Sequence, residues 1–130
     1  MKTAYVASRF ACKKTVKRIY SKLEKIGYTI SVDWTKHEST KPYSDNPGIT
    51  MDYTSADIAG ARKSDLFILI SDRAGTGMHT ELGAAIGHHI QFKNPLIYVI
   101  GKYVNSNPFF FHPSVRRRAT IEDVIAELKE

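Results

Sequence analysis

The sequence predicts an α/β domain with three layers and a mostly parallel sheet of four or five strands. Apolar runs of strand length alternate along the 130 residues with segments whose apolar residues recur at helical spacing. The run 66–70 (LFILI) is uninterrupted, as expected of a parallel strand that is covered on both faces. No repeat or linker divides the chain, so one domain over residues 1–130 is expected.

The first strand and the first helix follow one another directly. Residues 3–8 are apolar enough for a buried strand. Residues 13–26 predict an amphipathic helix, because their apolar members follow the pattern i, i+3, i+4, i+7, namely Val16, Ile19, Tyr20, Leu23 and Ile26. Gly27 is expected to end this helix, since glycine readily takes the left-handed conformation of a helix end.

A second strand and a long loop come next. Residues 28–34 (YTISVDW) contain β-branched and aromatic residues and predict a strand. Residues 35–53 have a loop composition with two prolines, and loops of that length often carry function. A short helix is expected to start at Thr54 or Ser55 and to end near Lys63.

The second half of the chain continues the alternation. After the strand at 66–70, a turn with glycines leads into a helix over residues 78–92, and a strand follows at 96–100. The last helix is expected to begin at Thr120, with Asp123 three residues later in a pattern that resembles a capping box. Arginines 116–118, just before it, are interpreted as a solvated turn.

Right-handed connections give the strand order 2-1-3-4, with a fifth strand left open, which is a flavodoxin-like arrangement. Ligands of such sheets bind beyond the carboxyl ends of the strands, where the strand order reverses. The residues expected to bind substrate at that edge are Ser8, Arg9, Trp34, Asp72, Gly75, Gly77 and Met78. Trp34 fits either stacking on a base or packing at the edge of the core.

The charge of the chain is unevenly distributed. Lys and Arg number 19 and Asp and Glu 13, which gives a net charge of +6. All of the excess lies in residues 1–30, which hold eight basic residues and one acid. Only Arg9, Lys13 and Lys14 are expected near the ligand edge, so the charge fits a phosphate group better than a nucleic acid.

Three further features of the sequence concern the cellular compartment and the need for a cofactor. A single cysteine, Cys12, excludes an intramolecular disulfide and suits a reducing compartment. The amino-terminal residues show no signal-peptide pattern, and no apolar run is long enough to span a membrane, so we expect a cytoplasmic protein. The histidines lack the spacing of metal ligands, and we expect neither a metal nor another cofactor.

The segment 75–83 (GTGMHTELG) is the sharpest feature of the sequence. Glycines at a strand-to-helix turn allow close approach of a ligand, and the free N–H groups of the helix favour oxygen atoms. Glu81 lies near the first turn, where the helix dipole is expected to keep its carboxylate ionised. An anionic carboxylate beside a cleft can act as a glycosyl nucleophile or stabilise an oxocarbenium ion.

Three motifs together resemble the nucleoside 2-deoxyribosyltransferase family, which includes the related deoxynucleoside 5′-monophosphate N-glycosidases. They are Tyr5 in AYVAS, Asp57 in DIAG with Asp65 opening the next strand, and Glu81 in GMHTELGAA. Residues 33–35 (DWT) and 112–113 (HP) also look like features of shorter family members. The resemblance runs over nearly the whole chain in order.

The resemblance implies a role for each matching residue. Glu81 would attack C1′ of a 2′-deoxynucleoside and form a covalent deoxyribosyl-enzyme, Tyr5 would orient that carboxylate, and Asp57 would bind or protonate the departing base. A second base or water would then take up the sugar with retention of configuration. The resemblance also implies a homo-oligomer whose subunits complete one another's sites, for which Phe109–Phe111 are a candidate contact.

The sequence departs from the transferases at Gly75, where they carry an acid that helps to bind the base. The monophosphate glycosidases also lack this acid, and in those relatives the 5′-phosphate would dock where this chain has Arg9, Lys13 and Lys14. Transfer to another base, as in nucleotide salvage, and hydrolysis of a monophosphate therefore both stay open. A non-catalytic nucleotide-binding module is a third reading, against which the intact Tyr5, Asp57 and Glu81 argue.

Overall fold

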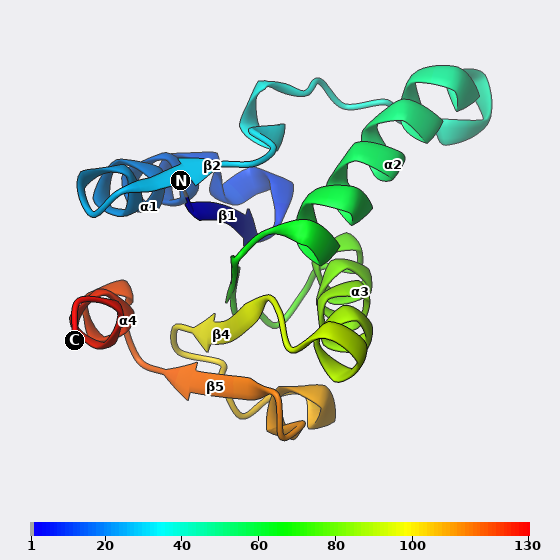
Figure 1. Cartoon of the computed structure of the whole chain (residues 1–130). Coiled ribbons are helices and arrows are strands. Elements are labelled where there is room, and N and C mark those ends of the chain that lie inside the picture. Colours follow the sequence, from blue (N-terminus) through cyan, green and yellow to red (C-terminus); the bar gives the residue numbers. More distant parts are fainter. Residues whose placement is uncertain (1) are drawn as a thin grey trace.

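A computed structural model describes residues 2–130 and shows a five-stranded, fully parallel sheet in the order β2-β1-β3-β4-β5 (Figure 1). The strands are β1 (Lys2–Ala7), β2 (Tyr28–Ile30), β3 (Leu66–Ile70), β4 (Leu96–Ile100) and β5 (Val115–Arg118). The longer helices are α1 (Lys13–Lys25), α2 (Pro47–Lys63), α3 (Gly77–Phe92) and α4 (Ile121–Leu128). Short 3-10 helices are η1 (Phe10–Cys12), η2 (Trp34–Lys36), η3 (Tyr43–Asp45) and η4 (Pro108–Phe111). The predicted three-layer flavodoxin-like fold is confirmed.

The helices cover both faces of the sheet. Figure 1 shows α2 and α3 on one side and α1 and α4 on the other. Lys22 of α1 and Glu122 of α4 are joined by an ion pair of 2.9 Å across their shared face. Because both faces are covered, residues 4–7 and 66–69 are fully buried, which explains their uninterrupted apolar sequence.

Two predicted helix ends are found in the structure. Gly27 has a φ of +97°, the conformation that ends α1 and that side chains rarely adopt. At α4, the Thr120 hydroxyl accepts a hydrogen bond of 3.2 Å from the backbone N–H of Asp123. Both signals are local in the sequence, and both predicted the element boundary.

The predicted start of α2 at Thr54 or Ser55 is wrong, since the helix begins at Pro47. Proline suits the first helical position because its φ is already helical and its missing N–H would have no partner there. The composition that indicated a loop therefore begins a helix instead. The first turns of α2 extend away from the rest of the protein in Figure 1 and leave Ile49 and Met51 exposed.

The interpretation of residues 116–118 as a solvated turn is also wrong, because they form most of β5. Arg118 forms an ion pair with Glu127 of α4. Arg117 lies 3.8 Å over the ring of Phe111. An edge strand accepts such side chains when their guanidinium groups find partners outside the sheet.

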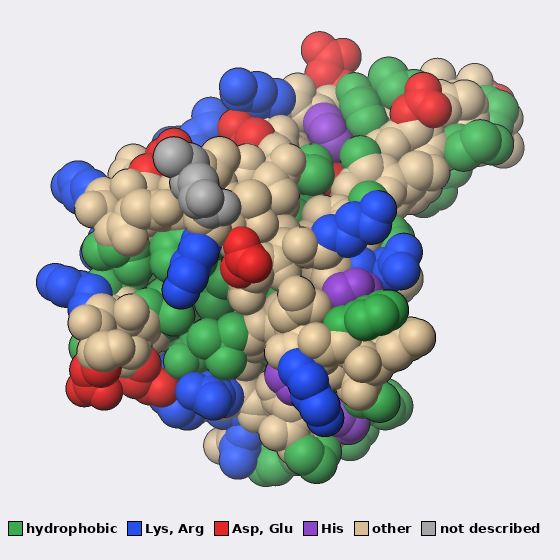
Figure 2. Space-filling model, viewed as in Figure 1, with side chains coloured by type: hydrophobic (Ala, Val, Ile, Leu, Met, Phe, Trp, Pro, Cys, Tyr) green, Lys and Arg blue, Asp and Glu red, His purple; other side chains and the backbone are tan. Residues whose placement is uncertain are grey.

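Figure 2 shows Lys and Arg side chains spread over the visible face, on the α1 side and elsewhere, although the sequence concentrates its excess positive charge in residues 1–30. None of the helices in residues 2–130 is both long and apolar enough to cross a membrane.

Candidate active site

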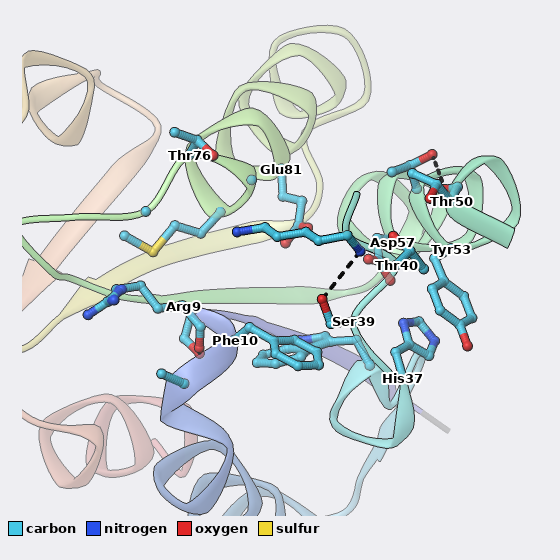
Figure 3. A pocket seen from close by; sticks show the side chains of 18 of the residues that line it. Arg9, Phe10, His37, Ser39, Thr40, Thr50, Tyr53, Asp57, Thr76 and Glu81 are labelled. Carbon is cyan, nitrogen blue, oxygen red and sulfur yellow. Dashed lines mark hydrogen bonds between the residues drawn. The ribbon is translucent and has the colours of Figure 1, made fainter. Parts of the chain in front are cut away.

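A pocket of about 930 Å³ opens beyond the carboxyl ends of β1 and β3, where the strand order reverses (Figure 3). Its walls come from the turn after β1, from η1, from the segment after β2, and from α2 and the start of α3. The residues predicted from the sequence that line it are Ser8, Arg9, Trp34, Asp57, Gly75, Gly77, Met78 and Glu81. The fold therefore brings most of the candidates into one place.

Two carboxyl groups face this pocket above a buried phenol. Figure 3 shows Glu81 descending from α3 and Asp57 from α2 into the same space. Tyr5 does not line the pocket, because its side chain on β1 is fully buried and stacks on Phe67 with ring centroids 6.0 Å apart. Gly60 of α2 provides room for it, since a Cβ there would lie 2.9 Å from Tyr5 Cδ2.

The Tyr5 hydroxyl lies beside the Glu81 carboxyl group. It is near enough to stabilise the charged carboxylate and so oppose the rise in the pKa of Glu81. The two groups nevertheless fall short of a hydrogen bond of normal geometry, which leaves the hydroxyl without a partner. Burial and the neighbouring acids raise the pKa of Tyr5 itself far above its usual range, so it stays a proton donor.

Burial controls the protonation of the two carboxyl groups. Desolvation, and then repulsion from Asp57, raise the pKa of Glu81 from 4.5 to about 8. Desolvation also raises the pKa of Asp57, while His37 acts to lower it. The expectation that the helix dipole keeps Glu81 ionised is therefore wrong for the free protein, since Glu81 lies beyond the first turn of α3 and desolvation prevails. At neutral pH the pair retains a proton.

Trp34, for which the sequence left base stacking and packing at the edge of the core both open, lines the pocket but is largely buried. Its side chain is only 5% exposed, and its Nε1–H donates a hydrogen bond of 2.6 Å to the carbonyl oxygen of Val6. This geometry is that of a packing residue at the edge of the core. Phe10, which lies 6.1 Å from Trp34 between ring centroids, is 44% exposed and presents its ring to the pocket (Figure 3). Phe10 belongs to no periodic apolar pattern in the sequence and was not predicted.

The three basic candidates have different positions. Arg9 lines the pocket, and its guanidinium group lies 3.7 Å from the carboxylate of Asp72, which does not itself line the pocket. Lys13 lies 3.9 Å over the Phe10 ring, and its ammonium group donates to the carbonyl oxygen of His37 at 3.3 Å. Lys14 is exposed and absent from the lining. Only Arg9 is therefore placed to meet a ligand in the pocket.

One wall was missed by sequence reasoning. His37 and Tyr53 stack with ring centroids 3.8 Å apart and an interplanar angle of 2°. Residues 38–41 continue this wall beside the two carboxyl groups. Only the length of the segment 35–53 had indicated a function here. The stack itself joins a residue of this loop to a residue of α2, and α2 was predicted to begin after Tyr53.

His79, for which the sequence predicted no role, holds the turn before α3. Gly75 has a φ of +100°, which favours glycine. Its carbonyl oxygen lies 2.9 Å from Nδ1 of His79, whose ring contacts that of Phe110. His79 thus fixes the loop that forms part of the pocket. Within residues 2–130, no three His, Cys, Asp or Glu side chains form a group that could hold a metal ion.

Fold and pocket together define a flavodoxin-like α/β protein with two carboxyl groups at the reversal of strand order. Neither the protein-family models nor the curated proteins yield a match to the sequence. Among solved structures, the chain is similar to the CMP N-glycosidase BcmB of Clostridium botulinum, with a TM-score of 0.60 and 17% sequence identity over 98% of both chains. At this identity the similarity shows a shared fold.

Proposed function

We propose that this protein is an enzyme that cleaves the N-glycosidic bond of a 2′-deoxynucleoside or its 5′-monophosphate, with Glu81 as nucleophile. The observation that carries the proposal is the convergence of Glu81 and Asp57 on one pocket above the buried Tyr5. An oxocarbenium-like transition state needs a carboxylate beside the sugar and a proton for the departing base. Two carboxyl groups that retain one proton can supply both. The name of the similarly folded BcmB, a CMP N-glycosidase, supports the same class of reaction.

In the proposed reaction, a carboxylate oxygen of Glu81 forms a bond to C1′ while the C1′–N bond breaks. The electron pair of that bond leaves with the base, which takes up the proton of Asp57. When substrate is bound, the shared proton must therefore lie on Asp57. Tyr5 favours this distribution, because its hydroxyl stabilises the charged form of Glu81. A second displacement at C1′ then frees Glu81, with retention of configuration overall.

Transfer of the sugar to a second base is our first proposal for this displacement, and water is the alternative acceptor. Two observations favour hydrolysis of a 5′-monophosphate as the second candidate. Gly75 lies in the pocket where the transferases that the sequence resembles carry a base-binding acid. The Arg9 side chain lines the pocket, is 43% exposed and has an ion partner at 3.7 Å that a phosphate group can displace.

The test is incubation with deoxyadenosine or its 5′-monophosphate, with and without a free acceptor base, followed by chromatography. Exchanged base supports transfer, base released without exchange supports hydrolysis, and neither product refutes the function. Glu81→Ala should abolish both products and keep the circular dichroism spectrum of the fold; an active variant would refute the role of Glu81. Arg9→Gln should raise KM for the monophosphate by at least about tenfold and leave KM for the nucleoside nearly unchanged.

We further propose that residues 1–130 form one catalytic domain and that the protein acts in the cytoplasm.

We also propose that copies of the protein associate through η4. Phe109 and Phe111 are 66% and 54% exposed on this short helix, whereas Phe110 between them is buried. Light scattering should give a mass above one chain, and Phe109→Ser with Phe111→Ser should lower it. Binding to DNA that weakens steeply with salt would instead support a nucleic-acid-binding protein.

A further inference from the structure

A second cavity, of about 480 Å³, lies beside β5, the strand with three consecutive arginines at one end of the sheet (Figure 1). Its walls come from β5 and from the loop after β4, and the residues that line it are Gly101, Val104, Val115, Arg116, Arg117, Arg118 and Ala119. None of them lines the pocket that holds Glu81 and Asp57. The cavity is therefore separate from the candidate active site, and its volume is that of a site for a small molecule.

The positive charge at this cavity has little acid to balance it. Residues 95–121 contain Lys102 and the three arginines but no Asp or Glu. Glu127 of α4 pairs with Arg118, whose Nε and Nη2 bond to its two carboxylate oxygens. Arg116 and Arg117 form no ion pair with any residue in the described part of the chain, 2–130. The cavity therefore carries an excess of positive charge.

Neutral partners hold the two arginines that have no ion pair. Arg117 donates a hydrogen bond of 2.5 Å to Oδ1 of Asn105, and its guanidinium carbon lies 3.8 Å from the centroid of the Phe111 ring. The guanidinium carbon of Arg116 lies 5.9 Å from the centroid of the Tyr98 ring. An amide or an aromatic ring orders a guanidinium group without cancelling its charge. Both groups are therefore positioned and still able to attract an anion.

The alternation of side chains along β5 places these cations on both faces of the sheet. Arg118 pairs with α4 on one face, and Arg117 contacts Phe111 of η4 on the other. Because β5 is the last strand, no strand among residues 2–130 bonds to the backbone groups on its outer side. An anion at this edge can therefore accept hydrogen bonds from guanidinium groups of both faces and from backbone N–H groups between them.

The loop that closes the cavity is fixed by the sheet. Gly101 has a φ of +109°, and its backbone N–H bonds to the carbonyl oxygens of Arg118 and Ala119 at 3.3 and 3.1 Å. Two residues later, the backbone N–H of Tyr103 donates a hydrogen bond of 3.0 Å to the buried hydroxyl group of Ser71. The wall is thus part of the framework of the protein, so binding of a ligand need not order it.

We propose that this cavity binds the phosphate group of a small phosphorylated molecule, with Arg116 and Arg117 as the residues that bind it. Guanidinium groups match phosphate oxygens in geometry and form charge-assisted hydrogen bonds with them. A bounded cavity favours a small molecule over a nucleic acid, which needs an extended basic surface. The lining contains no residue of η4 or of the catalytic pocket, so the proposal depends neither on association of copies nor on the proposed function.

Pyrophosphate is the probe, and amide NMR spectra of the 15N-labelled protein at constant ionic strength are the readout. We expect shifts at Gly101 and Ala119, which line the cavity, that saturate by about 10 mM pyrophosphate. Pyrophosphate that binds near Arg9 in the catalytic pocket is recognised separately, by shifts at Gly75 and Gly77. Absence of saturable shifts at Gly101 and Ala119 overturns the proposal.

Substitutions then test which side chains bind the probe. Arg116→Gln and Arg117→Gln should each weaken the binding measured at Gly101 about tenfold. Arg18→Gln is the matched control, because it removes the same charge from the exposed surface of α1, outside both cavities. Equal weakening by Arg18→Gln would show attraction to net charge alone and overturn the site. The two cavity variants are independent, so one decides if the other does not fold.

Single-stranded DNA of about 20 nucleotides distinguishes the source of the phosphate. We expect DNA to shift Gly101 and Ala119 no more tightly than pyrophosphate does, because the cavity is bounded. Tighter binding of DNA through these residues, with a steep dependence on salt, would overturn the assignment to a small molecule.

Discussion

Replacing Glu81 with glutamine should change how the stability of the protein depends on pH. The pKa of Glu81 is raised from 4.5 to about 8 in the folded protein, chiefly by desolvation. Between these two values the folded protein holds a proton that the unfolded chain has lost. The free energy of unfolding should therefore fall as pH rises through this range, and the contribution is fully lost above the folded pKa.

The magnitude follows from the same shift. Each pKa unit corresponds to about 1.4 kcal/mol, so a rise from 4.5 to about 8 sets an upper limit of about 5 kcal/mol. The pocket is open to solvent and Asp57 shares the proton, which reduces the effect to about 2–3 kcal/mol. Glu81→Gln carries no titrating group, so relative to the unaltered protein it should gain this amount between pH 5 and pH 8.

Urea unfolding of both proteins at pH 5, 6.5 and 8 measures the difference. Any effect of the amide that does not depend on pH adds the same offset at each pH and is removed by the comparison. Glu122→Gln is the matched control, because it makes the same chemical change on the exposed surface of α4, outside the pocket lining. Parallel stability curves for Glu81→Gln and the unaltered protein would refute a buried, protonated Glu81.

Two further predictions concern glycine and tryptophan. Gly60→Ala should destabilise the protein by about 1–3 kcal/mol in thermal unfolding and lower turnover, because the added Cβ would lie 2.8 Å from Val32 and 2.9 Å from Tyr5. Gly83→Ala is the control: its Cβ would have no atom within 4 Å, so this variant should be neutral or more stable by up to about 1 kcal/mol. Trp34→Phe should lower the free energy of unfolding by about 1–3 kcal/mol, because it leaves the buried Val6 carbonyl without its donor, and equal stability in urea would contradict that role.

Much of the fold could be predicted because the signals are local. The apolar spacing in residues 13–26 and the apolar run at 66–70 directly report which faces are buried. The predictions were wrong where contacts with residues far away in the sequence determine the local structure. Arg118 lies in a strand that pairs with β4, and its guanidinium group pairs with Glu127 of α4; no property of the arginines alone reveals these contacts. A proline such as Pro47 suits both a loop and the first position of a helix, so the composition of this segment does not show that α2 begins there.

The candidate site likewise has features with a local sequence signal and features that depend on contacts between distant segments. Glu81, Asp57 and Tyr5 could be selected from motifs, and the fold places two of them in the pocket and the third beneath it. The ionisation of Glu81 could not be predicted, because it depends on burial by several elements and not on position along a helix. The stack of His37 on Tyr53 likewise joins two segments whose approach no single stretch of sequence specifies.

The two ends of the sheet limit how copies of this protein can meet. At one end β2 has only three residues, and at the other β5 carries Arg116, Arg117 and Arg118, with no further strand paired to its outer side among residues 2–130. A short strand and a row of cations are poor templates for hydrogen bonding to a strand from another molecule. The sheet therefore resists growth into the continuous ribbons that lead to fibrous aggregates, and the association that we propose through η4 does not use its edges.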